Sequence, residues 1–597
     1  GNITPFLDTN TNVSGQYDFE VLNPLYNSTL NNKDKTSNIS ITNNFRAIYR
    51  LSNQFRAQAN LQLNKRITTL ETFLSPDHLD FRNTTLFEKG TYSNTRTDNF
   101  SYKINGMLSY ATIINDSHNL NVNVRSEIEE TRNERLTIDA VGFPSGTNGN
   151  PAYAFSYKPD SKPSTAMSVY RRVNLLASVN YDYKRKYLFD ATYRIDGSTT
   201  FGKNEKFTPF WAVGFGWNLN NEFNMDPDQV QMFKLRANVG STGNQGFGSL
   251  TSTSIYGFNQ EVNLFGQGVN LSTIANPDLK WQKTLNTSFG MDGVFFKNRL
   301  STTFNYFNKN TDPLVVAVDL PSSTGVYAYP INTGNLSSIG TEVIIRYSPI
   351  YNLKERVMWT LGYTSSVIRT KFDGFANTLK SLNDNQLSGN TLKRFKDGFS
   401  PDDLWAVPSL GIDPTTGKEV FLTKDGKQTF EFNTDDEIVM GKSRPDVEGV
   451  ISSNFRYKGF SFGVNMRYRI GADKFNYALY NKVENISRNG VTLNQDRRAL
   501  YDRWQNPGDV SKFKSISLTS YTPISSRFIQ KENELIGESI NVGYDFRNAK
   551  WVKSLGFNSI RLNAYMNDVF RFSTIRVERG TSYPFSRAVS FSVNASF

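Results

Sequence analysis

Apolar and polar residues alternate, one by one, over long stretches of this chain. Six apolar residues of the segment 39–51 fall on one side of an extended strand: Ile39, Ile41, Phe45, Ala47, Tyr49 and Leu51. Polar residues such as Arg46 and Arg50 fall on the other side, because successive side chains of a strand point to opposite faces. The segment 55–63 repeats the pattern after a short polar turn, which predicts a β-hairpin.

The same unit recurs along the chain. We predict seven further hairpins, at about 100–110 with 120–124, 173–183 with 187–195, 208–220 with 231–242, 281–296 with 299–309, 340–350 with 356–370, 450–458 with 460–471, and 534–546 with 558–570. A last alternating segment, Ser586–Phe597, ends on an aromatic residue. The pattern therefore predicts about 17 strands, many of ten or more residues, which is long enough to cross a tilted bilayer.

Connection lengths divide into two classes. Within hairpins the turns are short, whereas the connections between hairpins are long, at about 65–97, 131–171, 243–280, 310–339, 371–449 and 472–533. Short turns at one end and long loops at the other are typical of an outer-membrane β-barrel. We therefore predict an all-β, transmembrane antiparallel β-barrel, with 1–38 as an extracellular loop and 39–597 as the C-terminal part of the barrel.

Composition agrees with strands rather than helices. The 597 residues include 45 Phe and 29 Tyr but only 9 Met, and no run approaches the ~20 apolar residues of a membrane helix. Cysteine is absent, which excludes disulfides and thiolate sites. The net charge of +12 is scattered, so we expect a basic lumen and rim facing outer-membrane lipid, lipopolysaccharide or anionic solutes rather than nucleic acid.

Motifs that carry chemistry are weak. His78 and His118 lack metal-ligand spacing, and the pairs Asp402-Asp403 and Asp435-Asp436 can hold Ca²⁺ but fit solvated turns better. Gly243–Gly248 lacks the helix and Lys that a phosphate-binding loop needs. We predict no enzyme, no catalytic residue, no metal and no cofactor.

Two turn-rich stretches and several aromatic residues stand out in the long loops. Residues 412–421 and 424–427 predict a small hairpin inside the 371–449 loop, where a metal site is the alternative. Aromatic residues of the loops can stack on sugars, grip peptides, or pack the loops together: Phe399, Trp405, Tyr327, Tyr329 and Tyr583. Trp405, Tyr327 and Tyr329 are kept as substrate-binding candidates.

Five motifs in order resemble those of SusC-like (RagA-like) TonB-dependent outer-membrane transporters of Bacteroidota. They are the strand pair, DGSTTFG loop and following strand at 181–222, KLRANVGSTGNQ at 234–245, NPDLKWQKT through DPLV at 276–315, LPSSTGVYAYPINTGNLSSIGTEV at 320–343, and YPFSRAVSFSVNASF at 583–597. They cover about 170–597, while 1–169 match only through NPLYN at 23–27. Ser592 stands where the family has a glycine, and SIG at 338–340 replaces its NKG.

The resemblance implies a 22-stranded barrel, of which this chain would hold the last 17 strands, with the plug domain, TonB box and N-terminal extension absent from the chain. It implies active import of oligosaccharides or peptides across the outer membrane, with a SusD-like surface lipoprotein as partner and the TonB–ExbB–ExbD system as energy source. The alternative is a SusC-like barrel that serves as a structural subunit of an outer-membrane assembly or secretion complex.

Overall fold

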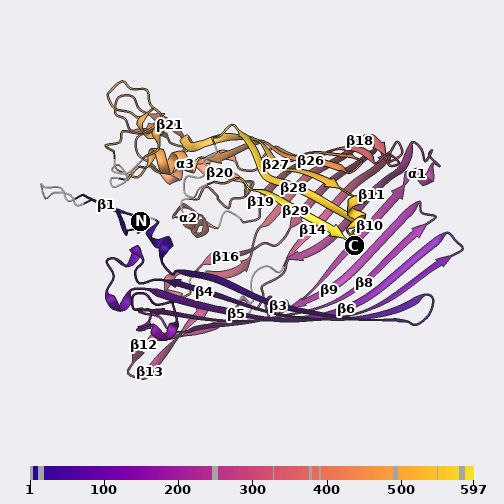
Figure 1. Cartoon of the computed structure of the whole chain (residues 1–597), viewed down its shortest axis with the longest axis horizontal. Coiled ribbons are helices and arrows are strands. Elements are labelled where there is room, and N and C mark those ends of the chain that lie inside the picture. The colour runs from indigo at the N-terminus through magenta and orange to yellow at the C-terminus, as the bar shows by residue number, and fades with distance from the viewer. Residues whose placement is uncertain are drawn as a thin grey trace.

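The chain forms one large antiparallel sheet that curls into a barrel (Figure 1). A computed structural model describes all residues except 1–3, 11–18, 24, 245–252, 327, 376–378, 389–390, 488–494, 519, 548 and 577–584. Small hairpins gather in the loops at one end of the strands, and the shorter turns lie at the other end (Figure 1). Among the described helices, none combines the length and the apolar character that crossing a bilayer requires.

Seventeen long strands build the described sheet, if the two-residue β7 (Ser156–Tyr157) is left out. In chain order they are β3 (Lys33–Arg50), β4 (Phe55–Leu74), β5 (Thr91–Ile114), β6 (His118–Val141), β8 (Ser164–Tyr183), β9 (Tyr187–Ser198), β10 (Phe207–Asn218), β11 (Val230–Asn244), β14 (Gln282–Phe295), β15 (Leu300–Thr311), β18 (Asn335–Asn352), β19 (Val357–Asp373), β25 (Val447–Tyr457), β26 (Phe460–Phe475), β27 (Ile529–Asp545), β28 (Ser559–Ser573) and β29 (Val589–Ser596).

All eight predicted hairpins are present, with antiparallel register throughout. Their turns use residues that tolerate a left-handed backbone: Asn115 and Asp116 have φ of 52° and 51°, and Asn298 has φ of 66°. Such turns match the right-handed twist of the paired strands. Two turns are longer and hold short helices, α1 (Leu219–Glu222) and α4 (Lys550–Ser554).

Several strands run further than predicted. β4 and β5 pair as far as Leu74 and Thr91, and β6 pairs with β8 as far as Thr137 and Ser164, so the loops predicted at 65–97 and 131–171 are shorter. In these extensions the apolar residues, such as Ile67, Leu70 and Phe73, no longer alternate strictly with polar ones, so the pattern does not mark them, yet the backbone ladder continues. β3 likewise begins six residues before the predicted start at 39, and β1 (Phe6–Asn10) pairs with β2 (Phe19–Leu22) inside the predicted 1–38 loop.

The remaining loops contain structure of their own. The loop after β11 holds β12 (Ile255–Asn263) and β13 (Gly266–Thr273), and the loop after β15 holds β16 (Val315–Asp319) and β17 (Ala328–Asn332). The loop after β19 holds α2 (Lys380–Ser388), β20 (Asp403–Ala406), β21 (Ser409–Ile412), β22 (Glu419–Leu422), β23 (Gln428–Thr429) and β24 (Ile438–Lys442). The loop after β26 holds α3 (Tyr477–Leu479), the π-helical η7 (Tyr480–Glu484) and the 3₁₀ turn η9 (Arg497–Leu500).

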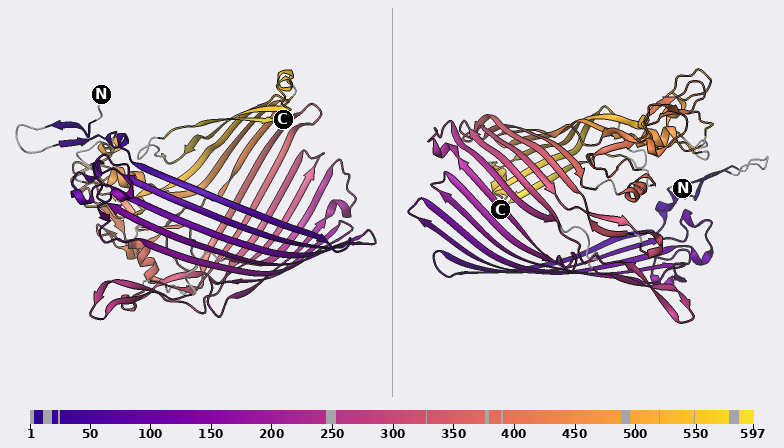
Figure 2. Two further views of the ribbon diagram at one scale, coloured as in Figure 1. Left: turned by 60° about the horizontal axis from the view of Figure 1, so that its bottom comes forward. Right: turned by 180° about the vertical axis from the view of Figure 1, so that it is seen from behind.

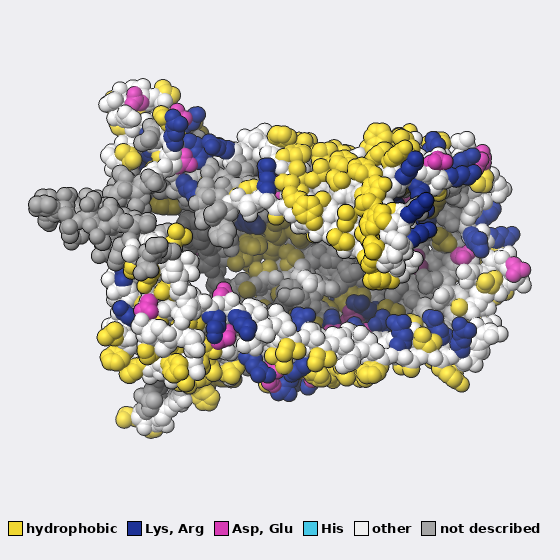
Figure 3. Space-filling model, viewed as in Figure 1, with side chains coloured by type: hydrophobic (Ala, Val, Ile, Leu, Met, Phe, Trp, Pro, Cys, Tyr) yellow, Lys and Arg dark blue, Asp and Glu magenta, His cyan; other side chains and the backbone are white. Residues whose placement is uncertain are grey.

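The two end strands of the sheet do not meet along a ladder. Among the described residues, β3 has register only with β4, and β29 only with β28. Every residue of β3 after Lys33 is exposed, and the ribbons of the two end strands stand apart in Figure 2. The space-filling view in Figure 3 shows a hollow along this side. Because all the pairings are antiparallel and the number of long strands is odd, β3 and β29 run in the same direction.

The predicted apolar face of the last strand is exposed. Val589, Phe591 and Val593 are 53%, 79% and 68% exposed, and they alternate with Ser590 and Ser592. Figure 3 shows hydrophobic side chains gathered over the outer side of the neighbouring strands. The apolar residues therefore cover the outside of the wall, and the polar residues face inward.

Candidate substrate path

A row of short polar side chains crosses the inner wall near the short turns. Asn121 on β6 lies opposite Asn180 on β8, Asn180 opposite Asp190 on β9, and Gly214 on β10 lies between Asp190 and Asn238 on β11. A Cβ on Gly214 would come within 2.3 Å of Asp190 Oδ2 and 2.6 Å of Asn238 Oδ1. The glycine therefore leaves room for polar groups to converge from both sides.

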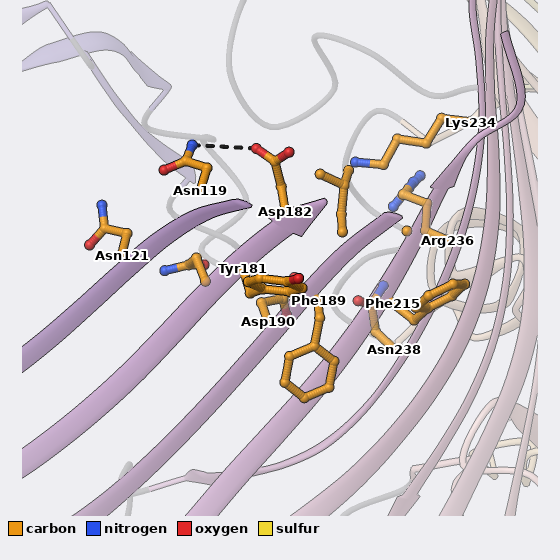
Figure 4. A pocket seen from close by; sticks show the side chains of 13 residues that line it. Asn119, Asn121, Tyr181, Asp182, Phe189, Asp190, Phe215, Lys234, Arg236 and Asn238 are labelled. Carbon is orange, nitrogen blue, oxygen red and sulfur yellow. Dashed lines mark hydrogen bonds between the residues drawn. The ribbon is translucent and has the colours of Figure 1, made fainter. Parts of the chain in front are cut away.

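These residues line a pocket in the lumen (Figure 4). Asp182, Lys234 and Arg236 stand on one side of the strands, while the ring of Phe189 points the opposite way (Figure 4). Asn119 Nδ2 donates a hydrogen bond of 3.3 Å to Asp182 Oδ2. Amides, carboxylates and cations in one place supply both donors and acceptors, which suits hydroxyl or peptide groups.

Arg236 is held by side chains of two neighbouring strands. Its Nε donates to Asp292 Oδ2 at 2.6 Å, and one Nη donates to Asn305 Oδ1 at 2.6 Å. Gly290 lies between Arg236 and Asn305 in the register, and a Cβ there would be 2.7 Å from the guanidinium carbon. The guanidinium thus crosses Gly290 to reach the second strand over, so its charge is fixed in place on the lumen surface.

A second ionic group lies on β5, β6 and β8. Lys103 Nζ is 2.8 Å from a carboxylate oxygen of Glu127 and 3.9 Å from one of Glu129. Arg125 also pairs with Glu127, and Arg172 with Glu129. The cations of this part of the wall are largely neutralised by neighbours, so the lumen is polar rather than simply basic.

The motifs behind the resemblance meet at the opposite end of the wall. Gly202, the last residue of the DGSTTFG loop, and Asn204 just after it donate backbone hydrogen bonds of 3.1 and 3.0 Å to Leu279 and Pro277 of NPDLKW. Lys280 N donates to Asn332 Oδ1 of the PINTG motif at 2.7 Å.

An aromatic cluster lies under this junction. Trp281 is 1% exposed and stacks on Phe201 at 4.2 Å between ring centroids, with Phe210 against its edge. Gly243 packs here, because a Cβ would come 2.3 Å from Phe210, while Gly246 and Gly248 lie outside the described residues. The motifs are therefore spacers and packing residues that join three loops.

The loops after β19 and β26 fold into one unit, here called the loop body (described residues of 392–445 and 475–528). Its buried core draws on both loops, with Leu392, Leu404 and Ala406 from the first and Phe475, Tyr480, Val483, Ala499, Phe513 and Phe528 from the second. Its parts cluster above the barrel end in Figure 1. The predicted small hairpin is confirmed here, since β22 pairs with β21 and β23.

A buried ion network ties the two loops together. Arg527 donates to Glu484 at 2.5 Å and to Glu419 at 2.9 Å, and the side chains of these three residues are at most 10% exposed. Ser525 Oγ donates to Glu419 at 2.5 Å, and Thr522 Oγ1 to Glu484 at 3.0 Å. Burial alone would lower the pKa of Arg527, but the two carboxylates raise it.

For two neighbouring cations, burial outweighs the nearby carboxylate, so their pKa values are lowered rather than raised. Burial lowers the pKa of Arg503 and of Lys514, although Glu484 favours their charged forms. Arg503 donates to the carbonyls of Ala499 and Lys514 at 2.8 Å each. These hydrogen bonds close the second loop on itself.

The substrate-binding candidates lie in different places. Trp405, on β20, is 6% exposed and packs edge-on against Phe399 at 4.8 Å, with Lys396 Nζ 5.3 Å from its ring. Tyr329 is half-buried on β17, opposite Val318. Tyr327 and Tyr583 lie outside the described residues. Trp405 and Tyr329 thus sit in separate loops, and substrate contact by either stays a prediction.

The acidic pairs and histidines are engaged locally. Asp402 pairs with Arg444 at 2.5 Å, and Asp436 Oδ1 accepts from Lys424 N at 2.9 Å. His78 Nδ1 accepts from Asp80 N at 3.2 Å, and His118 Nδ1 is 2.7 Å from Tyr181 Oη. In the described part of the chain, no three His, Asp or Glu side chains gather as a metal site would require.

Comparison with known proteins assigns this barrel to a family. The family model for the TonB dependent receptor-like β-barrel matches residues 2–486, which is most of the chain. The chain belongs to this family. The predicted resemblance to SusC-like transporters is confirmed, and the TonB-dependent receptor-like β-barrel is an outer-membrane architecture.

Curated relatives of this family barrel are receptors from two bacteria. TonB-dependent receptor P39 of Formosa agariphila is 27% identical over 79% of this chain and 49% of its own length. TonB-dependent receptor SusC of Bacteroides thetaiotaomicron is 24% identical over 66% of this chain and 40% of its own. The chain thus spans about half the length, or less, of these relatives.

A solved structure has the same fold as this TonB-dependent receptor-like barrel. The RagAB peptide importer in its open-open state superposes with a TM-score of 0.85 at 18% identity, over 100% of this chain and 64% of that chain. At this identity the likeness speaks for the fold alone. The relatives named here are receptors and transporters, and none indicates a catalytic family.

Proposed function

We propose that this chain is the barrel wall of an outer-membrane, TonB-dependent importer that takes up oligosaccharides or peptides. The polar lumen carries this proposal, above all the row of Asn121, Asn180, Asp190 and Asn238 beside the anchored Arg236. Neutral amides and paired charges form reversible hydrogen bonds with a polar solute. They lack an unpaired charge that would hold the solute too tightly, which suits its passage.

A SusD-like surface lipoprotein is the proposed partner at the loop end. The loop body supports this, because its buried core and ion network keep a large structured surface beside the barrel mouth. The names of the relatives, TonB-dependent receptor P39 and TonB-dependent receptor SusC, support the TonB dependence. Energy would come from the TonB–ExbB–ExbD system acting on a plug domain.

A 22-stranded barrel is the proposed complete wall. β3 and β29 run in the same direction, and an antiparallel barrel closes only on an even number of strands. Five further strands would satisfy this rule.

The test is uptake by the native host with and without the full-length protein. We expect deletion to abolish uptake of one fluorescent oligosaccharide or peptide pool. We expect the double variant Asn180→Trp, Asn238→Trp to reduce that uptake, because both new indole rings would project into the lumen from the row of polar residues. The matched control is Leu235→Trp, since Leu235 alternates with lumen residues on β11 and is 37% exposed.

Unchanged uptake of every pool after deletion would reject the import proposal. If deletion instead lowered the amounts of other outer-membrane proteins, the barrel would be a structural subunit of an assembly complex. Equal losses in the lumen variant and the Leu235 control would reject the lumen row as the path.

A further inference from the structure

Three adjacent hairpins end in basic turns at the short-turn end of the barrel. The turns after β18, β25 and β27 lie side by side, because Lys458 N donates to Arg356 O and Asp545 N donates to Gly459 O, both at 2.9 Å. Together these turns carry six cations and one acid: Lys354, Arg356, Lys458, Arg547, Lys550 and Lys553 with Glu355. The turn between β10 and β11 has the opposite character, with Glu222, Asp226 and Asp228.

Several of these cations have no carboxylate partner in the described part of the chain. Arg547 is 3.3 Å from Asp545, but ion pairs are not found for Lys354, Arg356 or Lys458 among the described residues. Lys458 Nζ instead lies 5.4 Å from the ring of Tyr457. Lys354, Arg356 and Lys458 are all exposed. Their charges are thus available to a ligand.

These cations border a pocket with an aromatic side. Arg356, Lys458 and Arg547 line it together with Tyr544 and Phe546. Tyr544 and Phe546 rings are 4.6 Å apart, and Trp551 of α4 packs edge-on against Phe546 at 5.4 Å. Tyr544 and Trp551 are 47% and 48% exposed.

The aromatic side continues the outer, apolar face of the wall. Tyr544 alternates with inward-facing residues on β27 and lies opposite Leu562 and Phe460, both apolar. Exposed Trp and Tyr next to an apolar belt mark the level of lipid headgroups. Cations that flank such rings at the rim therefore meet headgroups, and an anionic phosphate is the group that Lys and Arg bind there.

We propose that the turns at Lys354–Arg356, Lys458 and Arg547 form a binding site for an anionic phospholipid headgroup in the leaflet next to the short turns. The phosphate lies among Arg356, Lys458 and Arg547, and the acyl chains run along Tyr544 and the outer wall. Nearby Trp551 stands at the headgroup. The proposal does not rest on import, because the aromatic side of the site, Tyr544, belongs to the outer face of the wall.

The test uses the full-length protein in phosphatidylcholine vesicles that contain brominated phosphatidylglycerol or brominated phosphatidylcholine. Bromine quenches tryptophan emission on contact, and the signal of Trp551 is the difference between the protein and its Trp551→Phe variant. We expect phosphatidylglycerol to be preferred at Trp551 by at least about fivefold, as one Lys or Arg contact with a headgroup gives. A triple variant, Lys354→Gln, Arg356→Gln and Lys458→Gln, should reduce the preference towards one.

The matched control removes three charges from another short turn. Lys184→Gln, Arg185→Gln and Lys186→Gln should leave the preference at Trp551 unchanged, because that turn follows β8, several strands away. Raising the KCl concentration should weaken the preference in the unmodified protein, which tests the site even if the triple variant fails to fold. Equal quenching by the two lipids, or the same loss in the control, would overturn the proposal. Displacement by millimolar inorganic phosphate at constant ionic strength would assign the site to a soluble anion instead.

Discussion

Arg236 reaches Asn305 across Gly290, so three neighbouring strands are linked by one guanidinium on the lumen side. The link depends on the absence of a side chain at Gly290, since a Cβ would lie 2.7 Å from the guanidinium carbon. Residues 290–292 therefore hold Arg236 in place. Gly290 leaves room for the guanidinium, and Asp292 accepts a hydrogen bond of 2.6 Å from it. Gly290 and Asp292 together thus hold the Arg236 guanidinium on the lumen side.

Gly290→Ala is expected to lower the stability of the barrel by about 1–3 kcal/mol, as overpacking of a filled site does. The measurement is the midpoint temperature of unfolding, read from the difference in gel mobility between the folded and the unfolded barrel. This midpoint should fall in the variant. Gly106→Ala is the matched control, because a Cβ at that strand glycine meets nothing within 4 Å. Equal midpoints for both variants would show that Arg236 moves aside without cost.

Arg527→Met is expected to loosen the loop body, because it leaves Glu484 and Glu419 buried without their cation. Breaking a buried pair in this way costs about 3–5 kcal/mol. Limited proteolysis of the full-length protein should then cut within 475–528. Lys512→Met is the control, since that side chain is 78% exposed. Adding Glu484→Gln and Glu419→Gln should restore part of the resistance, and no restoration would argue against charge burial as the cause.

Trp405→Ala is expected to destabilise the loop body rather than to remove a ligand contact, because the ring is buried against Phe399. A buried Trp replaced by Ala costs about 3–5 kcal/mol. Hydrogen exchange at β20 and β24 would rise, and Trp405→Phe would recover most of the protection. Unchanged exchange together with lost substrate binding would instead make Trp405 a binding residue.

Acid should open the turn that follows Asp496. Hydrogen bonds from Arg498 lower the pKa of Asp496 to about 2, below the usual Asp value. The stabilisation is therefore full above about pH 4 and is lost as the pH falls towards 2. Exchange of the amides of η9, corrected for intrinsic rates, should increase between pH 4.5 and 2.5, and Asp496→Asn should remove this dependence. A variant that keeps the full pH response would locate the titration elsewhere.

The hairpins could be predicted because a strand between lipid and a polar lumen must alternate at every residue. Pairs such as Lys297-Asn298 and Lys458-Gly459 then show where the strands turn. The extensions of β4 and β6 could not be predicted in this way, because the strict alternation ends there while the ladder continues. Phe73 and Ala140 of these extensions are instead buried in a cluster with the loop residue Phe143.

The loop body was invisible to pattern analysis for another reason. Arg527 and Glu419 lie 108 residues apart, and although Glu419 falls in the turn-rich stretch 412–421, nothing in that stretch points to Arg527. Arg236 and Asn305 contact each other in the lumen although they lie 69 residues apart. Such a contact can be predicted only when the register of three strands is known. The motifs that resemble SusC-like transporters proved to be mainly packing residues, so they predicted the family and the wall but not the groups that face a solute.

The parallel run of β3 and β29 links insertion to pairing. An unpaired edge presents a row of N–H and C=O groups, and the bilayer core has no water to satisfy them. Residues such as Ile39 and Phe45 on β3 expose an apolar face beside such an edge. For these strands, entry into the membrane and completion of the hydrogen-bond ladder are therefore one thermodynamic event. A sheet that stops at β3 would remain a template for any strand that reaches it first.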